Sequence, residues 1–222
     1  MILAIDTSTQ WMGLALFNGS QVLYEKVWRT NRRHTVELVP SIQNVFIETG
    51  LEMAALTAIA VALGPGSFTS MRIGLAVAKG LALALHLPVI GIPSLDISAF
   101  GQPVQELPLF CLLKIGRGRF AAQEYRSHGG IWEASGDLLT LTPQELEERV
   151  TSPTLICGEI DAEDRRTLER RWRNALVCSP AANMRRPAYL AEMAWARLAA
   201  GQVDDPVSLA PIYVHTLGSP AL

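Results

Sequence analysis

The sequence predicts an α/β protein in which one arrangement of strands and helices occurs twice. The chain has 222 residues, 49% of them hydrophobic, which is enough for a substantial core. Short apolar runs alternate with longer helical runs over residues 2–92, and the same order returns over residues 109–200. Gln102–Pro108, with its two prolines, separates the two series. We therefore expect a duplicated two-lobed fold whose mixed sheets are flanked by helices.

The first half of the chain contains five predicted strands and two predicted helices. The strands are short and apolar: Ile2–Ile5, Met12–Phe17, Gln21–Trp28, Ala58–Leu63 and Leu87–Ile92. One helix spans about Arg33–Thr49, with apolar residues at helical spacing, and the other spans Ser67–His86. Pro40 lies inside the first helix and predicts a kink or a late start, because proline lacks the N–H that a helix uses.

The second half repeats this order. Its predicted strands are Leu109–Ile115, Phe120–Tyr125, Gly130–Leu141, Thr154–Cys157 and Ala175–Cys178. Its predicted helices are Pro143–Val150, with Thr142 as the cap, then Ala162–Arg173 and Pro187–Ala200. We expect a first lobe at residues 1–103 and a smaller second lobe at residues 104–222, with the tail packing back on the first lobe.

The charge of the chain argues against a strongly basic nucleic-acid binder, since the net charge is −2. Of the 19 basic residues, however, 16 are arginine. Two groups stand out, at Arg29, Arg32 and Arg33 and at Arg165–Arg173. They are either solvated surface or a local patch for phosphate or an acidic partner.

Several features predict a cytoplasmic protein without a metal site. The three cysteines are far apart beside apolar residues, as expected of reduced, buried thiols. The N-terminus begins as a strand without the basic start of a signal peptide. The apolar run Ile73–Leu85 is too short to span a membrane and contains Lys79. The four histidines have no ligand spacing, and no Cys-x-x-Cys motif is present.

Two loops form a candidate anion site. Asp6-Thr7-Ser8-Thr9 ends the first strand and resembles the phosphate-binding hairpin of actin-like and sugar-kinase ATPases. A Gly64-Pro65-Gly66 turn precedes a helix N-terminus, whose unpaired N–H groups attract anions. The candidate anion-binding residues are Asp6, Thr7, Ser8, Gly64, Gly66, Ser67 and Thr69. The alternative is a tight turn followed by an N-cap at Ser67.

The remaining chemistry of an ATPase is missing. The second half begins with Lys114-Ile115-Gly116-Arg117-Gly118-Arg119, which has no carboxylate to hold magnesium. The turn also lacks the Lys-Ser/Thr of a phosphate-binding P-loop, and the chain has no Gly-x-Ser-x-Gly elbow. We expect no catalytic residue and no cofactor.

The Ser67–His86 helix is apolar on nearly every face. Small residues form two stripes at four-residue spacing: Gly74, Ala78 and Ala82, and Ala76, Gly80 and Ala84. Small residues let another element approach closely. One stripe fits the protein's own sheet, and the other needs a second helix or another chain. The alternative is an ordinary three-layer core.

The chain resembles the bacterial TsaB (YeaZ) family over essentially its whole length. The matching segments are ILAIDTST, His34-Thr35-x-Glu37-Leu38-x-Pro40-x-Ile42, GPGSFTSMRIGLAVAKGLA, PVIGIPSL and Leu209-x-Pro211-x-Tyr213. Two departures are that Ser70 stands where the family usually has Gly, and that Ile115-Gly116-Arg117 stands where it usually has Asp-Ala-Arg.

The resemblance implies an actin-like (sugar-kinase-like) fold and a non-catalytic role in making tRNA N6-threonylcarbamoyladenosine next to the anticodon. It implies a TsaD-type transferase as partner, a TsaE-type ATPase in the complex, a homodimer when the chain is alone, and only indirect contact with tRNA. The expected partner-binding residues are Leu38, Ile42, Val45, Arg72, Ala76, Ala78, Lys79 and Ala82. The alternatives are a nucleotide-dependent phosphotransferase or ATPase and a glycoprotease-like peptidase.

Overall fold

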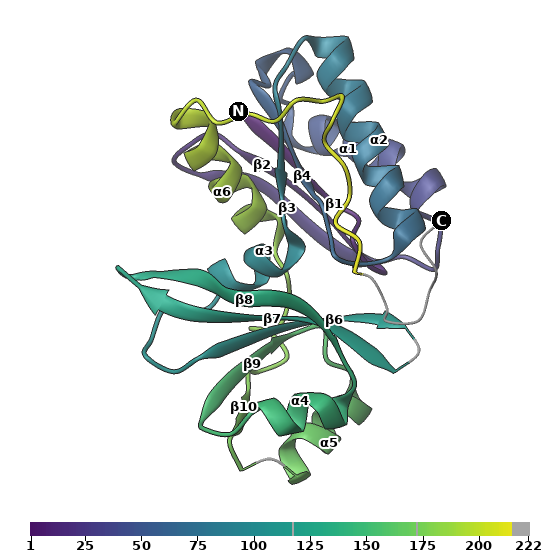
Figure 1. Ribbon diagram of the computed structural model, residues 1–222. Helices are drawn as coiled ribbons and strands as arrows, with labels where there is room; N and C mark the ends of the chain where they lie inside the picture. The colour runs from purple at the N-terminus through teal and green to yellow at the C-terminus, as the bar shows by residue number, and fades with distance from the viewer. Residues whose placement is uncertain (117, 172, 215–222) are drawn as a thin grey trace. The chain divides into compact units, whose positions relative to one another are not determined.

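The computed structural model describes residues 1–116, 118–171 and 173–214. It divides into two compact units. The first contains Met1–Ile97 and Arg186–Ile212, and the second contains Ser98–Arg185 together with Tyr213 and Val214. Each unit is built around one five-stranded sheet (Figure 1).

The first sheet has the strand order β3-β2-β1-β4-β5. Its strands are β1 (Ile2–Asp6), β2 (Trp11–Phe17), β3 (Val22–Arg29), β4 (Ala58–Ala62) and β5 (Val89–Ile92). β1, β2 and β3 form an antiparallel meander, whereas β4 and β5 run parallel to β1. The helices that follow β3, β4 and β5 are α1 (His34–Thr49), α2 (Phe68–Leu85) and α3 (Ser94–Phe100), with a short 3-10 turn at Met53–Ala55.

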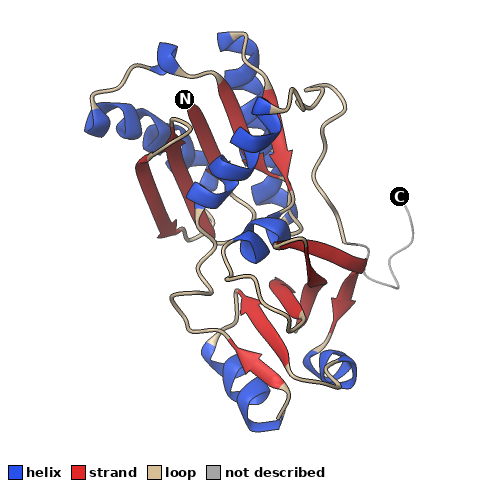
Figure 2. Cartoon of the chain, turned by 90° about the vertical axis from the view of Figure 1, so that its left-hand side faces the viewer, coloured by secondary structure: helices blue, strands red, loops and turns tan. Residues whose placement is uncertain are grey.

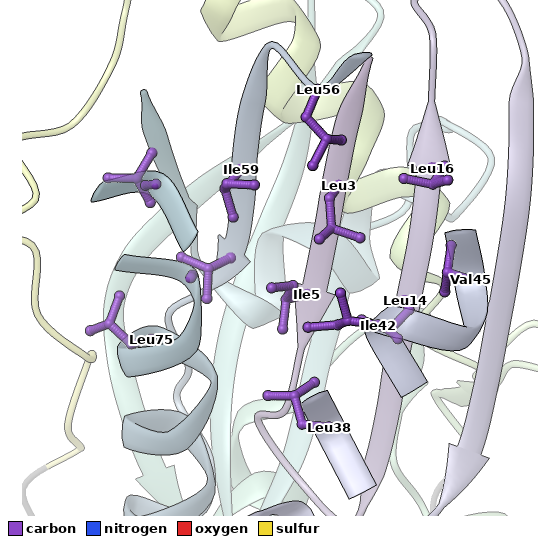
Figure 3. Close-up of a cluster of buried hydrophobic side chains, with 14 of the residues drawn as sticks. Leu3, Ile5, Leu14, Leu16, Leu38, Ile42, Val45, Leu56, Ile59 and Leu75 are labelled. Carbon is purple, nitrogen blue, oxygen red and sulfur yellow. The ribbon is translucent and has the colours of Figure 1, made fainter. Parts of the chain in front are cut away.

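Alternating residues along each strand divide the first unit into three layers. Leu3 and Ile5 of β1 pack against α1 and α2, while Ile2 and Ala4 face the opposite side. Figure 3 shows Leu38, Ile42 and Val45 of α1 and Leu75 of α2 packed over the strands. The opposite side is covered by α6 (Pro187–Ala199) through Leu190, Ala191 and Ala194.

The second unit repeats the topology. Its sheet has the order β8-β7-β6-β9-β10, again with an antiparallel meander and two parallel strands. The strands are β6 (Leu109–Gly116), β7 (Arg119–His128), β8 (Ile131–Leu141), β9 (Thr154–Gly158) and β10 (Ala175–Val177). Helices α4 (Pro143–Arg149) and α5 (Ala162–Arg171) cover one face of this sheet (Figure 2). The predicted fold class, a duplicated actin-like architecture of mixed sheets and helices, is confirmed.

Some expected details differ in the structure. The last helix, α6, was assigned to a lobe of residues 104–222, yet its apolar stripe packs on the first sheet and it belongs to the first unit. The division falls at Ser98 rather than in the Gln102–Pro108 stretch, and α3 was not predicted. Helix α1 continues through Pro40, which is exposed, so water can satisfy the carbonyl that the missing N–H leaves unpaired.

Candidate functional site

The two loops of the candidate anion site meet in the first unit. The loop Asp6–Thr9 follows β1, and the turn Gly64–Ser67 connects β4 to α2. Asp6, Thr7 and Ser8 are almost completely buried. The carboxylate of Asp6 accepts a hydrogen bond from the backbone N–H of Ser8 at 2.9 Å, which fixes the shape of the loop.

Hydrogen bonds between these loops and α3 occupy groups that would otherwise be offered to an anion. The backbone N–H of Ser67 donates to the carbonyl of Ser8 at 2.7 Å, and the Thr7 hydroxyl donates to the carbonyl of Ser70 at 2.8 Å. The hydroxyls of Ser8 and Ser94 lie 2.6 Å apart, and Ser94 also accepts from the N–H of Gly64. The hydroxyls of Thr7 and Ser8 and the backbone N–H groups of Gly64 and Ser67 therefore have hydrogen-bond partners within the first unit.

Two glycines make this close approach possible. A Cβ atom at Gly66 would lie 2.0 Å from the carbonyl oxygen of Ser8. A Cβ atom at Gly74, in the second turn of α2, would lie 2.1 Å from the Thr7 hydroxyl oxygen. Both positions thus need glycine for packing between α2 and the loop after β1, without reference to a ligand.

Ser67 occupies the N-cap position of α2, but its side chain makes no capping bond. Its hydroxyl instead accepts from the hydroxyl of Ser70 at 2.9 Å. The Ser70 hydroxyl also lies 3.4 Å from Nδ1 of His34, whose Nε2 lies 2.8 Å from the carbonyl of Thr9. Because a carbonyl only accepts, we assign the proton to Nε2 of His34. Ser70 therefore links α1 and α2.

The structure brings six of the seven candidate anion-binding residues together and leaves Thr69 exposed at the start of α2. The predicted N-cap position of Ser67 is confirmed, but its hydroxyl makes no capping hydrogen bond and instead has a side-chain partner. Anion binding stays a prediction. The contacts just described give these residues a structural role, because they pack the loop after β1 against α2 and α3.

The expected partner-binding residues separate into two groups. Five of them belong to the core of the first unit and cannot contact a partner in the folded chain: Leu38, Ile42, Val45, Ala78 and Ala82. Their helical spacing marks the face that packs on the protein's own sheet. Arg72 and Ala76 are exposed, and Lys79 is half-buried. Of the two small-residue stripes on α2, the one containing Ala76 and Gly80 therefore faces solvent.

Several large apolar side chains are exposed on the solvent side of α1 and α2. Val36 and Ile47 of α1 are 55% and 75% exposed, and Phe68 and Leu83 of α2 are 52% and 78% exposed. The guanidinium of Arg72 lies 3.7 Å from the ring centroid of Phe68. We call these side chains, with the small residues between them, the outer face: Val36, Val39, Ile47, Phe68, Arg72, Ala76, Gly80 and Leu83. Exposed apolar groups of this extent are typical of binding surfaces.

Helix α2 also has the length and hydropathy of a membrane span. It extends beyond the Ile73–Leu85 run, and its 18 residues have a mean hydropathy of 1.4 with a third of the segment buried. Its buried side packs in the core of the first unit, and core helices of soluble proteins share this composition.

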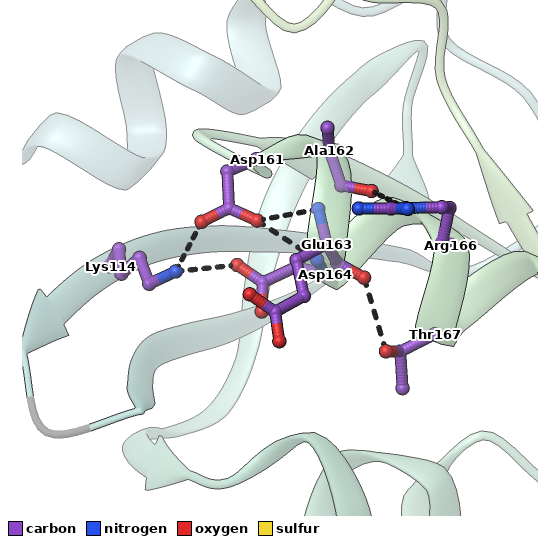
Figure 4. Close-up of polar contacts among 7 residues, drawn as sticks. All are labelled: Lys114, Asp161, Ala162, Glu163, Asp164, Arg166 and Thr167. Atoms are coloured by element: carbon purple, nitrogen blue, oxygen red, sulfur yellow. Dashed lines mark hydrogen bonds and ion pairs between the residues drawn. The ribbon is translucent and has the colours of Figure 1, made fainter.

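Strand β6 of the second unit carries Lys114 near its end, before the β6–β7 connection. Lys114 of β6 lies 2.9 Å from a carboxylate oxygen of Asp164 and 2.5 Å from one of Asp161, at the start of α5 (Figure 4). Arg117 lies outside the described residues. In the described part of the chain, no three His, Cys, Asp or Glu side chains gather as a metal site.

The contact between Lys114 and Asp161 predicts how the stability of the fold depends on acid pH. Hydrogen bonds from the Asp164 N–H and from Lys114 lower the pKa of Asp161 from 3.8 to about 2. Because the folded pKa is depressed, ionised Asp161 stabilises the fold above pH 3.8, and this contribution is lost as the pH falls towards about 2. Asp161 is half exposed, so we expect less than about 1 kcal/mol. In urea unfolding, the free energy of unfolding of Asp161→Asn should fall less steeply than that of the wild-type chain between pH 3.8 and about 2. The same pH dependence in both proteins would show that Asp161 does not make this contribution.

Comparison with known proteins identifies the family. The model of the family described as TsaD, tRNA N6-adenosine threonylcarbamoyltransferase, matches residues 28–148, more than half of the chain. The chain is 34% identical over 152 residues to the tRNA threonylcarbamoyladenosine biosynthesis protein TsaB of Escherichia coli, a match covering 67% of this chain and 65% of that protein. The chain belongs to the TsaB (YeaZ) family. The TsaB protein of Bacillus subtilis is 33% identical over 60% of this chain and 58% of its own.

These matches span only about six tenths of the length of the curated TsaB relatives. Solved structures extend the similarity of fold. A Pseudomonas aeruginosa protein described as similar to peptidase YEAZ superposes with a TM-score of 0.78 at 24% identity, over 96% of this chain and 99% of that one. YeaZ from the same organism gives a TM-score of 0.74 at 24% identity, over 95% and 99% of the two chains.

Proposed function

We propose that this TsaB-family chain is a non-catalytic scaffold and activating subunit in the biosynthesis of tRNA N6-threonylcarbamoyladenosine. It binds a TsaD-type transferase through the outer face of α1 and α2. The observation that carries the proposal is this apolar, solvent-exposed face beside small residues that permit close helix packing. The names of the curated relatives support the pathway.

The geometry of the loops after β1 and β4 supports a role without chemistry. A phosphate site needs donors that point into an open cavity. Here the Thr7 hydroxyl and the Ser67 N–H donate to neighbouring backbone carbonyls. Near the end of β6, Lys114 is paired with Asp161 and Asp164. These contacts favour a scaffold over a phosphotransferase or a peptidase.

The proposal extends to the assembly. A TsaE-type ATPase joins the complex, and without the transferase two copies of this chain associate through the same outer face. The protein acts in the cytoplasm, and tRNA binds chiefly to the assembled complex.

The proposal is tested by mixing the purified chain with the TsaD-type transferase of the same organism, with light scattering after size exclusion and with calorimetry. We expect a stable complex of the two proteins and no binding of ATP with magnesium to the chain alone. Micromolar ATP binding that is lost in Asp6→Ala, or no complex at micromolar concentrations, would overturn it.

A further inference from the structure

The segment between β3 and α1 is a concentrated basic surface. Lys26, Arg29, Arg32 and Arg33 lie within eight residues, and Glu37 is the one acidic residue between positions 26 and 37. Arg29, Arg32 and Arg33 are all exposed. We call residues 29–33 the arginine loop. Its local charge is strongly positive although the whole chain is slightly acidic.

The arginine loop is held in place by Thr30. Thr30 is 3% exposed, and its backbone N–H donates to the carbonyl of Gln10 at 2.8 Å. Its hydroxyl accepts the N–H of Arg33 at 3.1 Å. Arg29 donates from Nε to the side-chain oxygen of Gln10 at 3.1 Å, so a neutral group orients its guanidinium without cancelling its charge. Hydrogen bonds therefore hold the backbone of the loop, while its three arginines remain exposed.

Little of this charge is neutralised by the protein. Arg33 lies 3.7 Å from Glu37, and its side chain is 68% exposed. The same Glu37 carboxylate group accepts a hydrogen bond from Nε1 of Trp28 at 3.1 Å. Within the described residues, Arg32 makes no ion pair at all.

The other arginine-rich segment, around α5, is different. Between residues 159 and 173, five arginines are matched by five carboxylates. Arg165 pairs with Glu169. Figure 4 shows Nε of Arg166 donating to the carbonyl of Ala162 on its own helix. The side chains of Arg170 and Arg171 lie outside the described residues. This segment therefore mixes positive and negative charges, whereas the charged side chains of the arginine loop are all positive.

We propose that the arginine loop binds the phosphate backbone of the RNA substrate when the chain acts in tRNA modification. This inference rests on the proposed function. Arginine forks suit phosphate oxygens, and nucleic-acid interfaces are basic and polar. The loop contains Thr30 and Asn31 between its arginines and no large apolar side chain, whereas the core of a protein interface needs apolar or aromatic anchors. RNA is therefore the better occupant.

The test compares two triple variants of the full chain. In the first, Arg29, Arg32 and Arg33 are all changed to Ala. In the matched control, the exposed Arg126, Arg149 and Arg166 of the second unit are changed to Ala, which alters the net charge equally. Affinity for an unmodified tRNA transcript is measured against salt concentration, with and without the TsaD-type protein, and thermal unfolding confirms that each variant folds.

We expect the loop variant to lose at least about tenfold in tRNA affinity at about 0.1 M salt and to reduce the log–log salt slope by about 2 to 3, while the control changes affinity less than about threefold. Equal losses in both variants, or unchanged binding by the loop variant, would overturn the inference. Unchanged tRNA affinity with weakened TsaD-type binding would assign the loop to a protein instead. If the loop variant loses tRNA affinity but still forms the complex with the TsaD-type protein, the loss concerns the arginine loop and not the proposed function.

Discussion

Gly74→Ala is expected to lower the free energy of unfolding by about 2 kcal/mol, although alanine is the better helix former. The added Cβ would lie 2.1 Å from the Thr7 hydroxyl oxygen and 3.2 Å from both Cβ and Cγ2 of Thr7. To avoid this contact Thr7 must rotate or shift, and its hydroxyl would then lose the bond to the Ser70 carbonyl. Urea unfolding followed by tryptophan fluorescence measures the change.

The same helix provides a matched control. Gly80 has no atom within 4 Å of an added Cβ, so Gly80→Ala should raise stability by about 0.5–1 kcal/mol. In a Thr7→Ala background, the loss caused by Gly74→Ala should shrink, because the nearest contact atoms are gone. If Gly74→Ala and Gly80→Ala had the same effect, close packing of α2 on the Asp6–Thr9 loop would be the wrong explanation for Gly74.

Ala76→Trp is expected to weaken binding of a TsaD-type partner at least about 100-fold, equivalent to about 3 kcal/mol, without unfolding the chain. Ala76 is exposed beside Gly80 on α2, where a bulky ring would hold an incoming helix away. Isothermal titration calorimetry measures the affinity. Ala78→Trp is not an equivalent test, because Ala78 is fully buried and the ring would disrupt the core.

Ala196→Trp is the control for this prediction. Ala196 is an exposed alanine of α6, which covers the opposite side of the same sheet. The Ala196→Trp variant should bind the partner with the affinity of the wild-type chain and unfold at a similar temperature to it. Wild-type affinity in Ala76→Trp, or equal weakening in both variants, would show that α2 is not the docking helix.

Hydrophobic periodicity predicted most elements of the fold but not what they pack against. Leu38, Ile42 and Val45 have the spacing of one helical face, and that face is buried. The spacing shows that one face of the helix is apolar, but not whether that face packs on the protein's own sheet or on a partner protein. The expectation that these residues bind the TsaD-type partner was therefore wrong. The same ambiguity affected α6, whose apolar stripe could be recognised but not assigned to the first sheet.

Contacts between distant segments were the hardest features to predict. The Gly64–Ser67 turn was recognised from its glycines, but its contact with Ser8 depends on the positions of β1 and β4 in the sheet. Cys111 and Cys157 are likewise 46 residues apart, yet strand register places them opposite each other with their sulfur atoms 3.2 Å apart. Sequence spacing contains no information about such registers.

The central claim is that this chain acts by docking rather than by chemistry at Asp6. The most direct test is the rate of tRNA threonylcarbamoylation by a TsaD-type transferase and its TsaE-type ATPase, supplied with the wild-type chain, Asp6→Asn or Ala76→Trp. We expect Asp6→Asn to support a near-normal rate, because asparagine keeps an oxygen to accept the Ser8 N–H. Ala76→Trp should support about one hundredth of that rate or less at limiting protein concentration. A folded but inactive Asp6→Asn together with a fully active Ala76→Trp would contradict the claim.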